Sequence, residues 1–190
     1  MRVRRLEGEV IRDGVLAVSG RLDRKLFGPS ALVHLTPFMD GRGRPEKSGS
    51  LDGDGRRTLY LEVRRNFLSP MMLAFDTPIP ATTVGRRSES NVPAQALILM
   101  NDPFVVEQSE AWARRVLNSD EPFVAARIRT MYLTALGRPP SDREARDATD
   151  FLATQAKAYG LKREAIVGDT KLWADLCHVL FNLKEFVFVN

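Results

Sequence analysis

The sequence has very few residues that bind metals or form cross-links. Cys177 is the only cysteine, and His34 and His178 are the only histidines, among 190 residues. A lone cysteine excludes a disulfide within the chain and any zinc or iron–sulfur site built from several cysteines. Two histidines are too few for a histidine-rich metal site. We therefore predict no metal site and no cofactor in this chain.

Long apolar runs are also missing. No window approaches the roughly 18 to 20 consecutive apolar residues that a membrane-spanning helix requires. The first residues, MRVRRLEGEVIRDG, are basic but are not followed by the apolar stretch of an export signal. We expect neither a membrane span nor an export signal in this chain, which leaves its localisation unknown from the residues alone.

The sequence lacks the common catalytic and ligand-binding motifs. Ser88 and Ser90 are not framed by G-x-S-x-G, and the stretch from Gly85 to Ser88 lacks the Gly-Lys-Ser/Thr ending of a phosphate loop. The string DGDG at 52–55 would need a glutamate at position 63 to act as an EF-hand loop, and that position is Val63. We assign no catalytic residue and lean towards a protein that is not an enzyme.

One string resembles a haem attachment site. Residues 174–178 read ADLCH, which is C-x-x-C-H with alanine in place of the first cysteine. A single thioether with a histidine ligand is chemically possible. Apolar residues recur at helical spacing around the pair, however, which favours a buried thiol beside an imidazole at the edge of the core.

The pattern of the chain predicts one mainly α-helical domain over residues 1–190. With 44% hydrophobic residues, the chain can bury one sizeable core. Apolar spacing and capping residues predict helices over 4–18, 93–101, 102–117, 122–136, 141–159 and 170–183. The apolar segment AQALILM in the second of these should be buried, and the apolar chain end 185–189 should dock on the core. Segments 31–35 and 59–63 are predicted to be strands that pair. The fold class is thus a helical bundle with a small two-stranded antiparallel β element and one long, exposed, flexible loop over 39–57.

Positive charge is concentrated in the N-terminal third. Residues 1–65 carry 14 Lys and Arg against 9 Asp and Glu, a net of +5 within a total of +4. The loop string RGRP, with Arg42 and Arg44, matches the core of a motif whose arginines enter the minor groove of A·T-rich DNA. Acidic residues dilute the charge of this loop, so nucleic acid is an alternative partner and not the favoured one.

Four strings carry a family resemblance: YLEVRRNFLSPMMLAFDTP at 60–78, GRRSESNVPAQALILMNDPFV at 85–105, ALGRPPSDRE at 135–144 and LWADLCHVLFNLKEFVFVN at 172–190. Together they resemble the C-terminal domain of unknown function of large planctomycete cytochrome c-type proteins, the planctomycete-specific domain. This resemblance implies an extracytoplasmic protein with haem c in a separate N-terminal domain, whose other domains are the partners of this one. It implies a fragment, a split gene or an excised part, and it lends no catalytic residues.

The best candidate site is a central group of polar residues. Arginine forks bind carboxylate, sulfate or phosphate through paired hydrogen bonds, and amides recognise hydroxyls. The candidate ligand-binding residues are Arg64, Arg65, Arg86, Arg87, Asn91 and Gln95. The favoured alternative is structural, with Asp76, Asp102 and Glu62 neutralising these arginines.

Three functions follow from these observations. The favoured one is a non-catalytic accessory or interaction domain of a multidomain, haem c-linked protein. The alternatives are an acidic-polysaccharide binding or carbohydrate-active module that uses the arginines, and DNA binding through Arg42 and Arg44.

Overall fold

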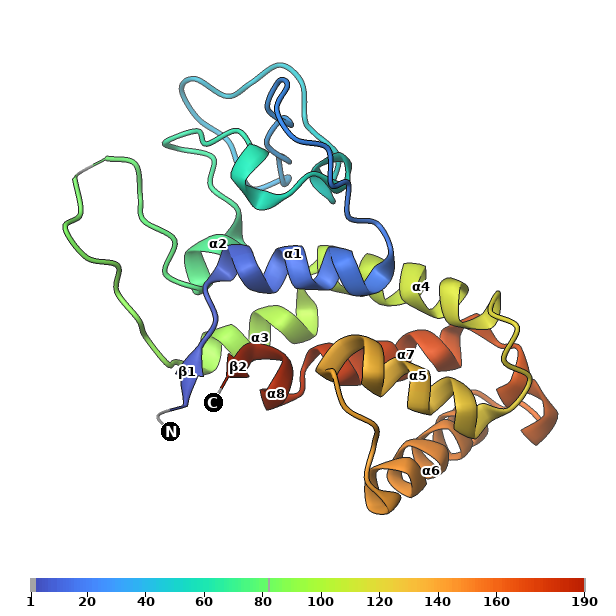
Figure 1. Cartoon of the computed structure of the whole chain (residues 1–190). Helices are drawn as coiled ribbons and strands as arrows, with labels where there is room; N and C mark the ends of the chain where they lie inside the picture. The colour runs from blue at the N-terminus through green and yellow to red at the C-terminus, as the bar shows by residue number, and fades with distance from the viewer. Residues whose placement is uncertain (1–2, 82, 190) are drawn as a thin grey trace.

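The computed structural model describes residues 3–81 and 83–189 and shows a bundle of α-helices beneath an irregular lobe (Figure 1). At the centre, helix α4 packs most extensively against α7 and also against α1, while α5 and α6 lie together beside α7. The helices are α1 (Gly8–Ser19), α2 (Pro70–Ala74), α3 (Pro93–Asn101), α4 (Pro103–Leu117), α5 (Val124–Leu136), α6 (Asp142–Ala158), α7 (Thr170–Phe181) and α8 (Lys184–Val187). Short 3₁₀ helices span Gly53–Gly55, Thr58–Tyr60 and Arg163–Val167. The predicted mainly helical class is confirmed.

Local signals place several helix ends where the sequence indicates, but α1 begins at Gly8 and not at the predicted residue 4, because Arg4 and Arg5 form β1. The side chain of Asp102 accepts a 2.9 Å hydrogen bond from the backbone N–H of Phe104, and Pro103 occupies the first turn of α4. Ser141 and Glu144 form the predicted capping box of α6. None of the described helices has the length and apolar character needed to cross a membrane.

Aromatic rings hold the end of the chain against the bundle. The rings of Trp112 on α4 and Phe181 on α7 have centroids 5.1 Å apart, and Phe181 lies 5.2 Å from Phe186 on α8. All three side chains are buried in the main core. The apolar C-terminal segment therefore docks on the core, as expected from its sequence.

The antiparallel β element is formed by the two ends of the chain. Strand β1 (Arg4–Arg5) pairs with β2 (Phe188–Val189), with Arg4 opposite Val189. The predicted pairing of 31–35 with 59–63 is wrong beyond one parallel bridge between Ala31 and Leu61. The reason is that loop residues engage the next backbone groups: Gly49 N–H donates to the carbonyl of Val33, and the Ser48 hydroxyl accepts from the N–H of Leu35.

The irregular lobe, residues 20–69, lies over α1 and contains a small core of its own (Figure 1). Val33, Leu35 and Phe67 form this core with Met39. Most of the loop at 40–50 is exposed, as predicted. The predicted exposure of 52–57 is wrong for Asp52, Gly53, Gly55 and Arg56, which are buried. The cause is a long-range contact from α1, since Arg12 donates to the carbonyls of Asp52 and Arg56.

Candidate functional site

The four arginines of the predicted cluster do not share one partner. Arg87 donates two hydrogen bonds, of 3.0 and 2.6 Å, to Glu9 at the start of α1. These bonds lower the pKa of Glu9 below its ordinary value, although burial opposes the shift. Arg64 pairs with Glu62 at 2.7 Å within the lobe. Arg65 and Arg86 are exposed and take part in no ion pair among residues 3–81 and 83–189.

Asp76 has a different partner from those considered in the sequence. Its carboxylate lies 2.8 Å from the guanidinium of Arg5 and accepts from the N–H and the hydroxyl of Ser90 at 2.7 and 2.9 Å. Burial raises the pKa of Asp76, but these hydrogen bonds and the Arg5 charge outweigh it and lower the pKa overall. Asp102, in contrast, serves as a helix cap. No spacing in the sequence signals the contact between Arg5 and Asp76, because 71 positions separate them.

Arg5 is itself unusual, since its side chain is only 7% exposed. The guanidinium lies 5.3 Å from the centre of the Phe75 ring, which adds a cation–π contact to the ion pair. Nε and Nη1 of Arg5 and the hydroxyl of Thr77 are buried and have no hydrogen-bond partner. Buried polar groups without a hydrogen-bond partner are uncommon. We therefore treat the surroundings of Asp76 as part of the candidate site.

Asn91 and Gln95 lie together on a pocket beside this cluster. The pocket has a volume of about 430 Å³ and lies between α3 and the C-terminal segment. We call it the terminal pocket; it is lined by Phe75, Asn91, Val92, Pro93, Gln95, Ala96, Leu99, Asn182, Lys184, Val187 and Phe188. Gln95 is held in place because its Nε2 donates to the carbonyls of Ala74 and Ser90 at 3.1 and 3.2 Å.

An exposed apolar face of α3 continues from the terminal pocket. Residues four apart lie on the same side of a helix, so Val92, Ala96 and Met100 form one row and Pro93 and Leu97 form the next. We call these five residues the apolar face of α3. Leu97 and Met100 are 59% and 57% exposed. The predicted burial of AQALILM is therefore wrong for Ala94, Ala96, Leu97 and Met100, which are exposed; only Gln95 and Leu99 of this helix are buried.

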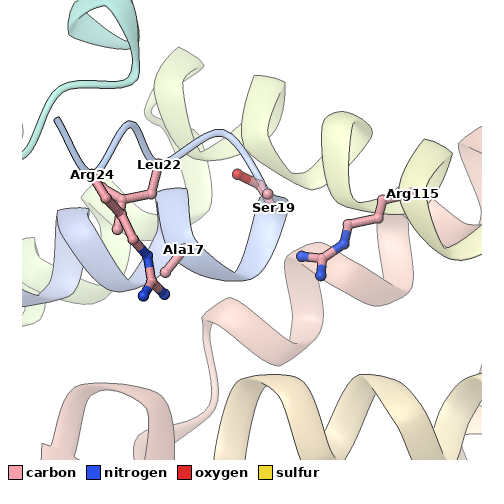
Figure 2. A pocket seen from close by; sticks show the side chains of 6 residues that line it. Ala17, Ser19, Leu22, Arg24 and Arg115 are labelled. Carbon is pink, nitrogen blue, oxygen red and sulfur yellow. The ribbon is translucent and has the colours of Figure 1, made fainter.

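A second hollow, of about 520 Å³, lies at the end of α1 (Figure 2). We call it the basic hollow; it is lined by Ala17, Ser19, Gly20, Leu22, Arg24 and Arg115. Arg115 Nη1 donates to the carbonyl of Val18 at 3.0 Å. The only sequence signal for this site is the positive charge of the N-terminal third, since Arg115 is distant from Arg24 along the chain.

The remaining candidate residues have local contacts. Arg42 is exposed, and the Arg44 guanidinium donates to the carbonyl of Met39 in the same loop. Cys177 is buried, as expected, and its burial raises the pKa of the thiol. The His178 ring Nε2 lies 3.0 Å from the carbonyl oxygen of Leu99. No group of three His, Cys, Asp or Glu in the described part of the chain could hold a metal ion.

Comparison with known proteins gives the family. A family model described as PSD1, protein of unknown function (DUF1553), matches residues 1–152. The chain belongs to this family. No curated protein and no solved structure shows a significant match. Within this DUF1553 chain, the matched segment includes the apolar face of α3 and all six residues of the basic hollow. The wall of the terminal pocket at 182–188 lies beyond it.

Proposed function

We propose that this DUF1553 chain is a non-catalytic interaction domain of a longer, extracytoplasmic protein that carries haem c in another domain. The apolar face of α3 and the adjoining terminal pocket receive an apolar segment of that other part of the protein. The observation that supports the proposal is the exposure of Leu97 and Met100, at 59% and 57%, on a helix whose only polar residues are Gln95 and Asn101.

The composition of the surface fits a protein contact. Burying a Leu or Met side chain completely contributes about 1.5 to 3 kcal/mol, so two such side chains next to a pocket favour an apolar partner. Asn91, Asn182 and Lys184 surround the pocket with amide and ammonium groups. An apolar centre with a polar rim is the usual organisation of a specific protein–protein interface.

The position of β1 favours a partner domain in the same longer protein. Arg5 pairs with Phe188, and Phe188 lines the terminal pocket. A domain joined ahead of β1 would therefore emerge next to the pocket. Linkage raises the effective concentration of such a domain to the millimolar range for a short connection, so a modest contact area suffices.

The test is a titration of this chain with the separately produced remainder of a longer family protein. Leu97→Asp and Met100→Asp place a charge at the centre of the contact and should each weaken association about tenfold or more. Phe38→Asp is the matched control, because Phe38 is 96% exposed and lies on the loop of the lobe. The Phe38→Asp variant should bind the remainder of the longer protein with the same affinity as the unsubstituted chain.

Two results would contradict the proposal. One is the absence of association, or an affinity that Leu97→Asp leaves unchanged. The other is a dimer of this chain in sedimentation velocity that Leu97→Asp dissociates, since the face would then belong to a second copy. Circular dichroism of each variant separates loss of contact from loss of folding.

A further inference from the structure

We infer that the basic hollow binds a sugar residue that carries a carboxylate or sulfate group. The hollow lies where α1 ends and α4 passes beside it, and the side chains of Arg24 and Arg115 are on its wall (Figure 2). None of its residues belongs to the apolar face of α3 or to the terminal pocket.

No carboxylate among the described residues lines the hollow or lies within 4 Å of the guanidinium groups of its two arginines. Most arginines around α1 and the lobe lie within 4 Å of a carboxylate, and the pairs are Arg12 with Asp13, Arg21 with Asp52, Arg56 with Asp23 and Arg57 with Asp13. Arg24 and Arg115 take part in no ion pair within the described residues. Two guanidinium groups on one hollow without a carboxylate attract an anionic group.

Arg115 is held in a fixed position before any ligand binds. Its Nη1 donates to the carbonyl of Val18, and its side chain lies over Gly20. A Cβ atom at Gly20 would be 3.1 Å from Cδ of Arg115, and Gly20 also has a φ of +82°, so glycine suits this position. A guanidinium that is already fixed loses little conformational entropy when it binds a carboxylate or sulfate.

Ser19 also lines the hollow, but the residue is 4% exposed and its hydroxyl is engaged inside the protein. The Ser19 hydroxyl lies 3.1 Å from the carbonyl of Leu16 and 2.7 Å from Oε1 of Gln108. The Ser19 hydroxyl therefore serves the protein's own network, and recognition of a ligand in the hollow rests on the two arginines.

The size and mixed lining of the hollow indicate a sugar acid. The hollow is open to solvent, and its volume of about 520 Å³ has room for more than a single ion. Ala17 and Leu22 add apolar surface next to the two arginines. A uronic acid or a sulfated sugar combines an anionic group, which matches the two arginines, with a C–H face, which matches the apolar lining.

Calorimetric titration with a sulfated disaccharide tests the inference. An uncharged disaccharide of equal size, sodium sulfate and an acidic peptide serve as comparison ligands. The sulfated disaccharide should bind most tightly, and added salt should weaken its binding. Arg24→Ala and Arg115→Ala should each lower the affinity about tenfold, because each removes charge-assisted hydrogen bonds. Arg114→Ala should not, because Arg114 pairs with Glu110 and does not line the hollow.

The other outcomes overturn the inference. These are no binding of the disaccharide, an equal loss in Arg114→Ala, sulfate alone binding as tightly as the disaccharide, or the acidic peptide binding more tightly. If Arg115→Ala fails to fold, Arg24→Ala and the charge-conserving Arg115→Lys remain as tests, with Arg115→Lys weakening binding through loss of the planar fork. Leu97→Asp should leave disaccharide binding unchanged. The disaccharide titration and the test of the proposed domain contact can therefore succeed or fail independently.

Discussion

Arg12 on α1 donates a 2.6 Å hydrogen bond from Nη2 to the backbone carbonyl of Asp52, which lies 40 positions along the chain. Nη1 of the same side chain donates to the carbonyl of Arg56 and to the hydroxyl of Thr58 at 3.0 and 3.1 Å. Burial lowers the pKa of Arg12, and the charges of Asp13 and Asp52 oppose that shift. One buried guanidinium thus attaches the irregular lobe to the helical bundle.

Replacing this guanidinium should destabilise the protein strongly. Arg12→Met retains most of the apolar stem but leaves the buried carbonyl of Arg56 without its Arg12 donor, while the carbonyl of Asp52 keeps only the N–H of Gly55. We expect a loss of about 3 to 5 kcal/mol in the free energy of unfolding, measured in urea. Arg57→Met is the control, since Arg57 is half exposed and its 3.4 Å contact with Asp13 should contribute about 1 kcal/mol or less. Equal effects of the two substitutions would contradict the role given to Arg12.

Acid should weaken the fold through the contact between the α5–α6 turn and α8. Arg138 lies 2.7 Å from both Glu144 and Glu185. The hydrogen bonds from Arg138, followed by that from the Ser141 N–H, lower the pKa of Glu144 from 4.5 to about 2. A carboxyl group with a lowered pKa in the folded state stabilises the fold fully above pH 4.5. This stabilisation is lost as the pH falls from 4.5 to about 2.

The measurement is the free energy of unfolding as a function of pH for the unsubstituted chain and for Glu144→Gln. The variant should be less stable at neutral pH, and the two curves should converge as the pH approaches 2. Arg138→Gln should reproduce most of the difference, because it removes the main hydrogen-bond donor. Parallel curves for the two proteins would show that Glu144 does not contribute to the acid sensitivity.

The parts of the fold that the sequence predicts are those with short-range causes. The cap at Asp102 and the capping box of Ser141 and Glu144 depend on residues two or three positions away, and both are confirmed. The pairing of β1 with β2 depends on the two ends of the chain, and no local signal brings these ends together. The burial of Asp52 depends on Arg12 in the same way, so composition alone indicated an exposed loop at 52–57.

For the candidate site, too, the sequence predicted short-range relationships but not long-range ones. Asn91 and Gln95 line one pocket because Asn91 lies just before α3 and Gln95 lies in its first turn. Their proximity was therefore predictable from the sequence. The partner of Asp76 was not, because Arg5 lies 71 positions away along the chain, in the strand that pairs with the C-terminal segment. The apolar segment of α3 was misassigned because periodicity shows which residues share a face but not whether another element covers that face.

Gln108 is a buried amide that the protein should tolerate losing. Its side chain is completely buried, Oε1 accepts from Ser19, and Nε2 has no partner. Gln108→Met keeps the shape and removes the unpaired N–H groups, while the Ser19 hydroxyl can still donate to Leu16. An unpaired buried donor costs about 1 to 3 kcal/mol, which exceeds the roughly 1 kcal/mol of one neutral hydrogen bond. The free energy of unfolding should therefore stay equal or rise by about 1 kcal/mol.

Gln95→Met provides the matched comparison, because Gln95 is a buried glutamine whose Nε2 has partners. That substitution leaves the carbonyls of Ala74 and Ser90 without their donor and should cost about 1 to 3 kcal/mol. Opposite signs for the two glutamines in urea unfolding would show that pairing of the amide, and not its burial, decides the effect. A loss of more than about 1 kcal/mol in Gln108→Met would show that Nε2 of Gln108 is hydrogen-bonded in solution, for instance to a buried water.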